Sequence, residues 1–424
     1  MVSQRMFQSR SLPCSTAGMD SKPPHLFPLT SVRFILAMWV LAYHQSFVYS
    51  TDQIARLPQP LFCFLRMAPI ALGFFFVLSG FVLAYNYPLD KRWKSDARKR
   101  FAIARFSRIY PAYCLGLLLT LPFAAKALLN RSTVLHGIRL AVTAALNWTL
   151  LQSWTPWTAL KWNPPGWSLS NDVFFYFCFP VIGIVLWRFS RRWALLGVGL
   201  LLCAAAAVPQ MVLLAKVAHG WAHQEVWPGP TLVELWLTRF NPVARLPDFC
   251  AGIILARTYS ILRERGHWLV GRGHWLYLPA LVAEACAILQ FQKLPPQPGY
   301  DGLLLPLDGC IILGFALGGG VLVRALSMRW MVFLGDASFA IYLLHTPIKW
   351  WMEALAKSRH TDALWSGGAT TFYVCFVVAV SCIVYEYVEK PLNRRLRARL
   401  GARLDRTQDT APKTPATGWR AASG

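Results

Sequence analysis

The sequence has few charged residues, and acidic residues are the scarcest of them. Only 15% of its 424 residues are charged, whereas about 25% is usual for a soluble domain. Hydrophobic residues make up 55% of the chain. This composition excludes a soluble enzyme, a disordered chain and a small secreted domain held together by disulfides.

The patterns of several common sites are also missing. The ten Cys are scattered, mostly within apolar stretches, and none forms a Cys-x-x-Cys pair. We expect them to be small buried hydrophobic residues. The sequence has no Walker, GxGxxG or HExxH motif, so it supports neither an ATPase nor a zinc enzyme. We expect no metal site and no permanently bound cofactor.

Long apolar runs dominate the chain. Stretches such as 67–89, 193–215 and 363–385 reach the ~20 residues that a helix needs to cross a bilayer. We predict an all-α, polytopic membrane bundle with about ten transmembrane helices. The expected spans are about 31–50, 67–87, 107–128, 169–189, 193–215, 243–262, 275–292, 302–323, 331–350 and 365–388.

Basic residues outnumber acidic ones, 43 to 19. They cluster at the ends of apolar runs, which is the pattern of cytoplasmic loops rather than of a nucleic-acid binder. All clusters fall on one side only if the short apolar segment 138–152 does not cross, so we predict that this segment is re-entrant or interfacial. Both termini are then cytoplasmic, in the inner (plasma) membrane of a bacterium.

The ends of the chain differ from its apolar body. The first 30 residues contain no apolar core, so we expect no cleaved signal peptide. We divide the chain into a cytoplasmic segment 1–25, a membrane domain 26–397 and a disordered cytoplasmic tail 398–424.

The first span contains two ionisable residues, Arg33 and His44. They are eleven positions apart, so they share one face of a helix and are separated by roughly 16 Å along it. Ionisable residues within a span indicate function, and His is suited to proton abstraction near neutral pH. The alternative for His44 is a histidine hydrogen bonded between helices, and the span alone does not separate the two.

Three other patterns are candidate sites. The segment from Trp167 through Ser168 and Ser170 to Asp172 predicts a helix start. Asp172 is expected in the first turn, either as a catalytic carboxylate that orients an imidazole and stabilises its protonated form or as a cap only. Arg105 and Arg108 share a helix face and can grip phosphates, or they reflect membrane topology alone. The remaining pattern is one polar helical face, made of Ser338, Tyr342, His345 and Lys349, which must meet protein or water. Asp336 is off this face and is expected at a helix start.

Taken together, these motifs resemble the acyltransferase-3 family of polytopic membrane O-acyltransferases. The resemblance extends from about Leu26 to Arg397, and the order and spacing of its motifs are specific. The motifs are Leu29-Thr-Ser-Val-Arg33 with ten residues before His44, Phe74-Phe-Phe-Val-Leu-Ser-Gly-Phe81, Arg105-x-x-Arg108-Ile-x-Pro111, Trp167-Ser-Leu-Ser170, Leu246-Pro-Asp-Phe249, Leu334-Gly-Asp-Ala-Ser338 with Tyr342 and His345, and Val388-Glu-Lys-Pro391.

The resemblance implies transfer of an acyl group, commonly acetyl, from acyl-CoA to a hydroxyl of a saccharide or glycoconjugate. It implies that His44 is the base, that Arg33 lies in the donor channel and that Arg105 and Arg108 contact donor phosphates. One position departs from the family, which usually carries Glu after Trp-Ser-Leu-Ser where this chain has Asn171-Asp172. The shorter Asp172 moves the carboxylate by about one carbon–carbon bond.

Two other functions compete with this one. Intramembrane charges also fit a transporter or flippase of a lipid-linked or anionic solute, although internal repeats of the kind found in many transporters are absent. A non-catalytic assembly or sensing subunit is the third hypothesis. The expected partners are the bilayer, acyl-CoA and a carbohydrate acceptor, and a protein that relays acyl groups or presents the acceptor would be a separate soluble chain.

Overall fold

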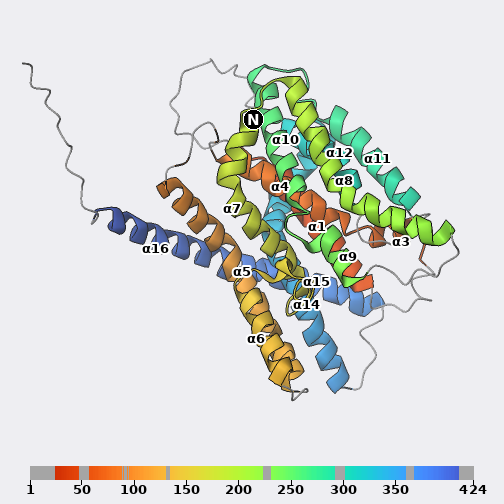
Figure 1. Ribbon diagram of the computed structural model, residues 1–424, viewed down its shortest axis with the longest axis vertical. Helices are drawn as coiled ribbons and strands as arrows, with labels where there is room; N and C mark the ends of the chain where they lie inside the picture. The colour runs from red at the N-terminus through yellow and green to blue at the C-terminus, as the bar shows by residue number, and fades with distance from the viewer. Residues whose placement is uncertain are drawn as a thin grey trace, which may run out of the picture.

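The computed structural model describes residues 24–46, 57–87, 89, 93, 95–129, 134–222, 231–291, 301–359 and 367–409. In these ranges the regular structure is all helical, as the sequence predicted (Figure 1). The main helices are α1 (Phe27–Ser46), α3 (Gln59–Arg66), α4 (Ile70–Asn86), α5 (Ser95–Leu129), α6 (Val134–Trp148), α7 (Trp167–Trp187), α8 (Arg192–Ala222), α9 (Leu232–Leu235), α10 (Leu246–Glu264), α11 (His274–Phe291), α12 (Asp301–Leu317), α13 (Val321–Leu326), α14 (Arg329–Ser358), α15 (Gly367–Val384) and α16 (Lys390–Asp409). Short irregular helices are η1 (Gln152–Trp154), η2 (Pro164–Gly166), η3 (Trp236–Phe240) and η5 (Tyr385–Glu389), and the last two are π-helical.

Six helices in the described ranges are long and apolar enough to cross a membrane. A seventh span results if α3 and α4, which meet at a 48° bend, count as one. Every expected span contains a helix, but the count of ten is not confirmed. Charged residues interrupt α10, and the 17 residues of α12 rise only about 26 Å, which is short of a bilayer core of about 30 Å.

The centre of the bundle consists of two helix pairs that touch through their backbones. A Cβ added at Gly80 of α4 would collide with the carbonyl of Phe249 on α10, and one added at Gly252 would collide with that of Val77. On α14, a Cβ at Gly335 would collide with the carbonyl of Thr30 on α1. Glycine is therefore required at these crossings, as at many helix contacts in membranes.

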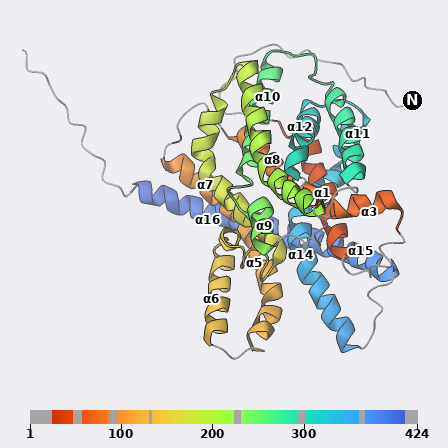
Figure 2. The ribbon, with the colours of Figure 1, turned by 45° about the vertical axis from the view of Figure 1, so that its right-hand side comes forward.

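Burial separates the central helices from the outer ones. Within the protein, 72% of the apolar window of α14 is buried, against 17% for that of α8. At the end of the molecule where α1 finishes, α6 lies beside the second half of α5, and α14 extends in the same direction (Figure 2). The predicted interfacial segment 138–152 is therefore mostly a helix packed on α5.

Part of the predicted disordered tail is helical. Residues 398–409 are not irregular but continue helix α16, which packs against α5. An ion pair between Arg100 and Asp405, 2.5 Å apart, joins the two helices. Residues 410–424 and nearly all of the predicted N-terminal segment 1–25 lie outside the described residues.

Candidate functional site

Helix α1 carries one candidate residue near each of its ends. Arg33 lies in its second turn, and His44 lies two residues before its end. Eleven residues separate them, or about 16 Å of helix. Because α1 packs closely on α14, each end of α1 faces side chains of α14. The Arg33 end also faces α5 and α7.

Two histidines meet where α1 ends. His44 Nδ1 is 3.0 Å from His345 Nε2 of α14, and the ring centroids are 4.9 Å apart with an angle of 28° between the planes. His345 is buried, with 1% of its surface exposed, whereas His44 is partly exposed. We call His44 and His345 the histidine pair. Of the two rings, His44 is therefore the one that a substrate can reach, and His345 is covered.

Neighbouring side chains fix the histidine pair from α14 and α15. Lys349 Nζ donates to the carbonyl oxygen of His44, at 3.0 Å. The hydroxyl of Tyr373 donates to the carbonyl oxygen of His345, at 2.8 Å. The predicted polar face of α14 therefore reaches α1 through His345 and Lys349. Ser338 does not extend this contact, since its hydroxyl donates to Gly335 in its own helix.

Tyr342 links α14 to the start of α7. Its hydroxyl lies 2.9 Å from that of Ser168 and donates to the carbonyl oxygen of Pro165, at 3.1 Å. The adjacent aromatic and serine residues hold this helix start in place. Trp167 packs edge-on against Phe240, with 4.9 Å between ring centroids.

Ser170 lies in the first turn of α7 and contacts the short helix η1 before it. Its hydroxyl accepts a hydrogen bond from the backbone N–H of Ser153, at 3.3 Å, and the hydroxyl of Ser153 donates to the carbonyl oxygen of Trp167. Ser170 is 1% exposed. These contacts give Trp167 and Ser170 supporting positions away from the open side of the histidine pair.

The cap interpretation of Asp172 is wrong. Helix α7 starts at Trp167, so Asp172 falls in the second turn, and the first turn contains no acidic residue. Its carboxylate faces Ser79 of α4, with which it is hydrogen bonded, and lies within electrostatic range of Arg33, Arg105 and Arg108. One of its oxygens, Oδ1, is buried and has no hydrogen-bond partner in the described part of the chain.

The three predicted arginines come together at the other end of α1. Arg33 lies within electrostatic range of Arg105 and Arg108, and also of Tyr176 and Asp336. We call Arg33, Arg105 and Arg108 the arginine cluster. Asp336 was expected at a helix start but lies eight residues into α14, where it faces this cluster.

Aromatic rings hold Arg105 in position. Its guanidinium carbon lies 5.5, 5.8 and 6.0 Å from the ring centroids of Tyr87, Phe101 and Tyr176, and it donates to the Tyr87 hydroxyl at 3.1 Å. Its Nε is buried and, among the described residues, unpartnered. A planar cation with an unused donor suits a phosphate-bearing ligand.

Arg108 has acidic neighbours instead. It lies within electrostatic range of Glu389, which is 4% exposed, and Asp336 is close to the same carboxylate. The neighbouring Glu386 pairs with Lys390, at 2.6 Å, whereas Glu389 is buried beside the arginine cluster.

Sequence reasoning missed Arg239. This residue lies in the π-helix η3, outside every predicted span, yet it is within electrostatic range of both His44 and Tyr342. Its Nε is buried without a hydrogen-bond partner in the ranges that the structure describes. The periodicity of apolar residues gave no signal here, because a π-helical turn disrupts it.

Known proteins place the chain in a family. A family model described as an acyltransferase domain, acyltransferase-3, matches residues 29–386. The chain is 28% identical to the acyltransferase MdmB of Streptomyces mycarofaciens over 93% of this chain and 99% of that protein. It is 27% identical to the exopolysaccharide production protein ExoZ of Rhizobium meliloti over 77% of this chain and 89% of that one.

A shorter relative is the protein 2 in the picA locus of Rhizobium radiobacter, which is 29% identical over 47% of this chain and all of that protein. No solved structure is significantly similar to the chain. The family match covers most of the chain, including the arginine cluster, the histidine pair and the helices between them. The chain therefore belongs to the acyltransferase-3 family and is a multi-pass membrane transferase.

Proposed function

We propose that the protein transfers an acyl group, with acetyl as the first candidate, from a coenzyme A thioester to a hydroxyl of a saccharide or glycoconjugate. The observation that carries this proposal is the separation of two unlike groups on α1. A cationic cluster suited to a nucleotide donor lies at one end, and a partly exposed imidazole suited to deprotonating a hydroxyl lies at the other.

The acyl group passes directly from the donor to the acceptor in one complex. His44 takes the proton of the acceptor hydroxyl while its oxygen attacks the thioester carbonyl carbon. The carbon–sulfur bond then breaks, and coenzyme A leaves as a thiolate that gains a proton. We favour this ternary-complex route because, among the described residues, no Ser or Cys is hydrogen bonded to the ring of His44 or His345 as an activated nucleophile. An acyl-histidine intermediate is the alternative route.

The backbone around the histidine pair favours one tautomer. The ring of His345 lies close to the backbone carbonyls of Ile341 and Tyr342 in its own helix, although its Nδ1 makes no hydrogen bond with the described residues. With its proton on Nδ1, His345 accepts at Nε2 from His44 Nδ1–H. The lone pair of His44 is then on Nε2, which is free to accept the proton of the acceptor. His345 is accordingly a positioning residue.

The donor would bind at the arginine cluster. Arg33, Arg105 and Arg108 supply guanidinium groups for the phosphates of coenzyme A, and the unused Nε of Arg105 fits this assignment. Asp172 would set the orientation of these arginines. We place this end at the cytoplasmic face of the inner membrane, with both termini cytoplasmic, because the basic loops lie at the same end.

Transfer from radiolabelled acetyl-CoA tests the proposal. Membranes containing wild-type protein should move label to a cell-envelope saccharide extract and release coenzyme A, and His44→Ala membranes should do neither. His25→Ala, which replaces an exposed histidine outside the site, is the matched control. Equal transfer by His44→Ala would show that His44 is not the base. If wild-type protein turns over no acyl-CoA of any chain length, the donor assignment is wrong.

A further inference from the structure

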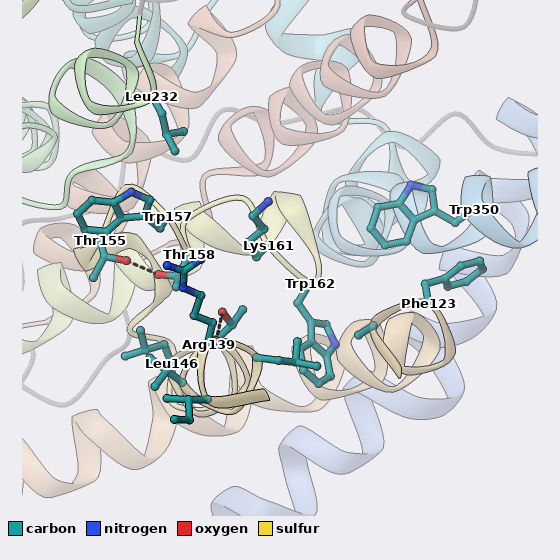
Figure 3. A pocket seen from close by; sticks show the side chains of 15 residues that line it. Phe123, Arg139, Leu146, Thr155, Trp157, Thr158, Lys161, Trp162, Leu232 and Trp350 are labelled. Atoms are coloured by element: carbon teal, nitrogen blue, oxygen red, sulfur yellow. Dashed lines mark hydrogen bonds between the residues drawn. The ribbon is translucent and has the colours of Figure 1, made fainter. Parts of the chain in front are cut away.

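A second candidate site lies where α5, α6 and α14 extend together. It is a cavity of about 920 Å³, near the upper end of the range for ligand pockets. Helix α6 forms one wall, and the loop of residues 155–162 forms another. Phe123 of α5 and Trp350 of α14 close one side, while Trp157 faces them across the cavity (Figure 3).

The lining combines apolar surface with two cations. Arg139 and Lys161 lie between Trp157 on one side and Trp350 on the other (Figure 3). Both basic side chains are exposed, and no carboxylate of the described residues lines the cavity. Neither has an ion-pair partner among the described residues. Trp157 is 68% exposed, so its ring is accessible to an apolar ligand.

The loop beside the cavity is held in a conformation that its residues do not favour alone. Leu150 and Trp162 have φ angles of 59° and 68°, in the left-handed region that bulky residues rarely occupy. Such conformations persist where tertiary contacts impose them, and they are common in ligand sites. The indole N–H of Trp162 donates to the Leu117 carbonyl at 3.1 Å, which fixes one aromatic wall.

The same loop connects the cavity to the histidine pair. Asn163, which follows Trp162, is fully buried and donates to the carbonyl of Leu343, at 3.3 Å. Leu343 lies two residues before His345. On α14, Trp350 follows Lys349, whose ammonium bonds the His44 carbonyl. The cavity therefore adjoins the histidine end of the protein, away from the arginine cluster.

We propose that this cavity holds the acceptor as an amphiphile, with its apolar chain against the tryptophans and its phosphate between Arg139 and Lys161. The inference rests on the proposed acyl transfer, since it concerns the acceptor of that reaction. Charge complementarity identifies the ligand, because two cations with no acidic neighbour in the described part of the lining suit an anion and the rest of the lining suits an apolar chain. A phosphate-linked glycolipid meets both demands and carries hydroxyls to His44.

A binding assay without an acyl donor tests this site. Full-length protein in phosphatidylcholine nanodiscs is titrated with a C15 isoprenoid phosphate that carries a photoactivatable diazirine, and cross-linked peptides are mapped by mass spectrometry. Cross-links are expected within residues 134–162. Arg139→Gln with Lys161→Gln should weaken binding roughly tenfold or more, because charge-assisted contacts to the phosphate are lost. Arg191→Gln, an exposed arginine outside the cavity, should not.

The tryptophans allow a second, matched comparison. Trp157→Ala should weaken binding of both the phosphate probe and its neutral alcohol. Trp193→Ala, at a position outside the cavity with a similar exposure of 70%, should leave both unchanged. Size-exclusion profiles of the variants verify that each still folds.

Three results would overturn the inference. They are equal affinity for the phosphate and the alcohol, cross-links outside the cavity, and displacement of the probe by phosphatidylglycerol nanodiscs, which would indicate a site for ordinary bilayer lipid. The assay also separates the two proposals. If the protein retains the probe but turns over no acyl-CoA, the cavity binds the amphiphile while the transferase mechanism proposed above fails.

Discussion

The arginine cluster and the histidine pair lie about three turns apart on α1, yet different interactions hold them. Arg105 is positioned by stacking against three aromatic rings and has one side-chain hydrogen bond to Tyr87. His44 and His345 are positioned by direct hydrogen bonds between three helices. Stacking tolerates small shifts of a flexible ligand, whereas hydrogen bonds fix the direction of a ring nitrogen.

This difference matches what each end would have to do. A nucleotide donor needs charge and contact area, which several arginines share. Proton abstraction needs one nitrogen at one angle and distance. We therefore expect the arginine cluster to tolerate substitution better than the histidine pair, and the predictions below test that ranking.

Replacement of His44 should have the largest effect. His44→Ala should lower kcat about 10²- to 10⁴-fold, which is the usual contribution of a general base, while the affinity for acyl-CoA stays unchanged. Single-turnover transfer and equilibrium acyl-CoA binding measure the two quantities. A parallel loss of donor binding would mean that the two ends of α1 are not separate sites.

Replacement of His345 should have the next largest effect. His345→Phe keeps a ring of similar size but removes the acceptor for His44 Nδ1–H, so kcat should fall about 10- to 100-fold, as for other residues that orient a functional histidine. His345→Gln, which can still accept, should recover part of the rate. The pH profile of kcat should shift in His345→Phe, and an unchanged profile would give His345 a packing role only.

Replacement of Arg105 should weaken the binding of the acyl-CoA donor and leave the rate of the chemical step nearly unchanged. Arg105→Gln should raise the KM for acyl-CoA about tenfold, with kcat at saturating donor nearly unchanged. Arg105→Lys should restore little, because an ammonium keeps the charge but loses the planar stacking on Tyr87 and Phe101. Steady-state kinetics with varied acyl-CoA measure this effect. Full rescue by Lys would show that charge alone matters.

Replacement of Ser338 should have the smallest effect. Among the described residues its hydroxyl bonds only to Gly335 of its own helix, so Ser338→Ala should change transfer less than about twofold and leave stability within about 0.5 kcal/mol. Tyr342→Phe should have a larger effect than Ser338→Ala, because it removes the hydrogen bonds to Ser168 and Pro165. Equal losses in both variants would place Ser338 against a substrate.

A good part of the candidate site could be predicted from the sequence because helix periodicity is local. Arg33 and His44 share a face of α1 by their spacing, and His345 and Lys349 share one on α14. What the spacing could not supply was a partner for each residue. That His345 meets His44, 301 positions away, depends on how α1 and α14 pack, and their contact at Gly335 and Thr30 sets this register.

Other errors have a similar physical origin. Asp172 and Asp336 were assigned to helix starts because carboxylates often cap helices, but both helices begin earlier in the structure. Arg239 escaped notice because its π-helical turn has no periodic pattern, and its place near His44 follows from Trp236 and Phe240 packing on the loop before α7 and on Trp167.

The sequence by itself determined that this chain is a helical membrane protein, which residues share a helix face, and the motif order that places it in a transferase family. These properties depend on composition and on spacing along the chain. Only the tertiary structure decided which faces meet, which carboxylates turn toward the arginines, and that a cavity lined by tryptophans and two cations adjoins the histidine pair. Such contacts join residues hundreds of positions apart, and they arise from packing energies that no local pattern encodes.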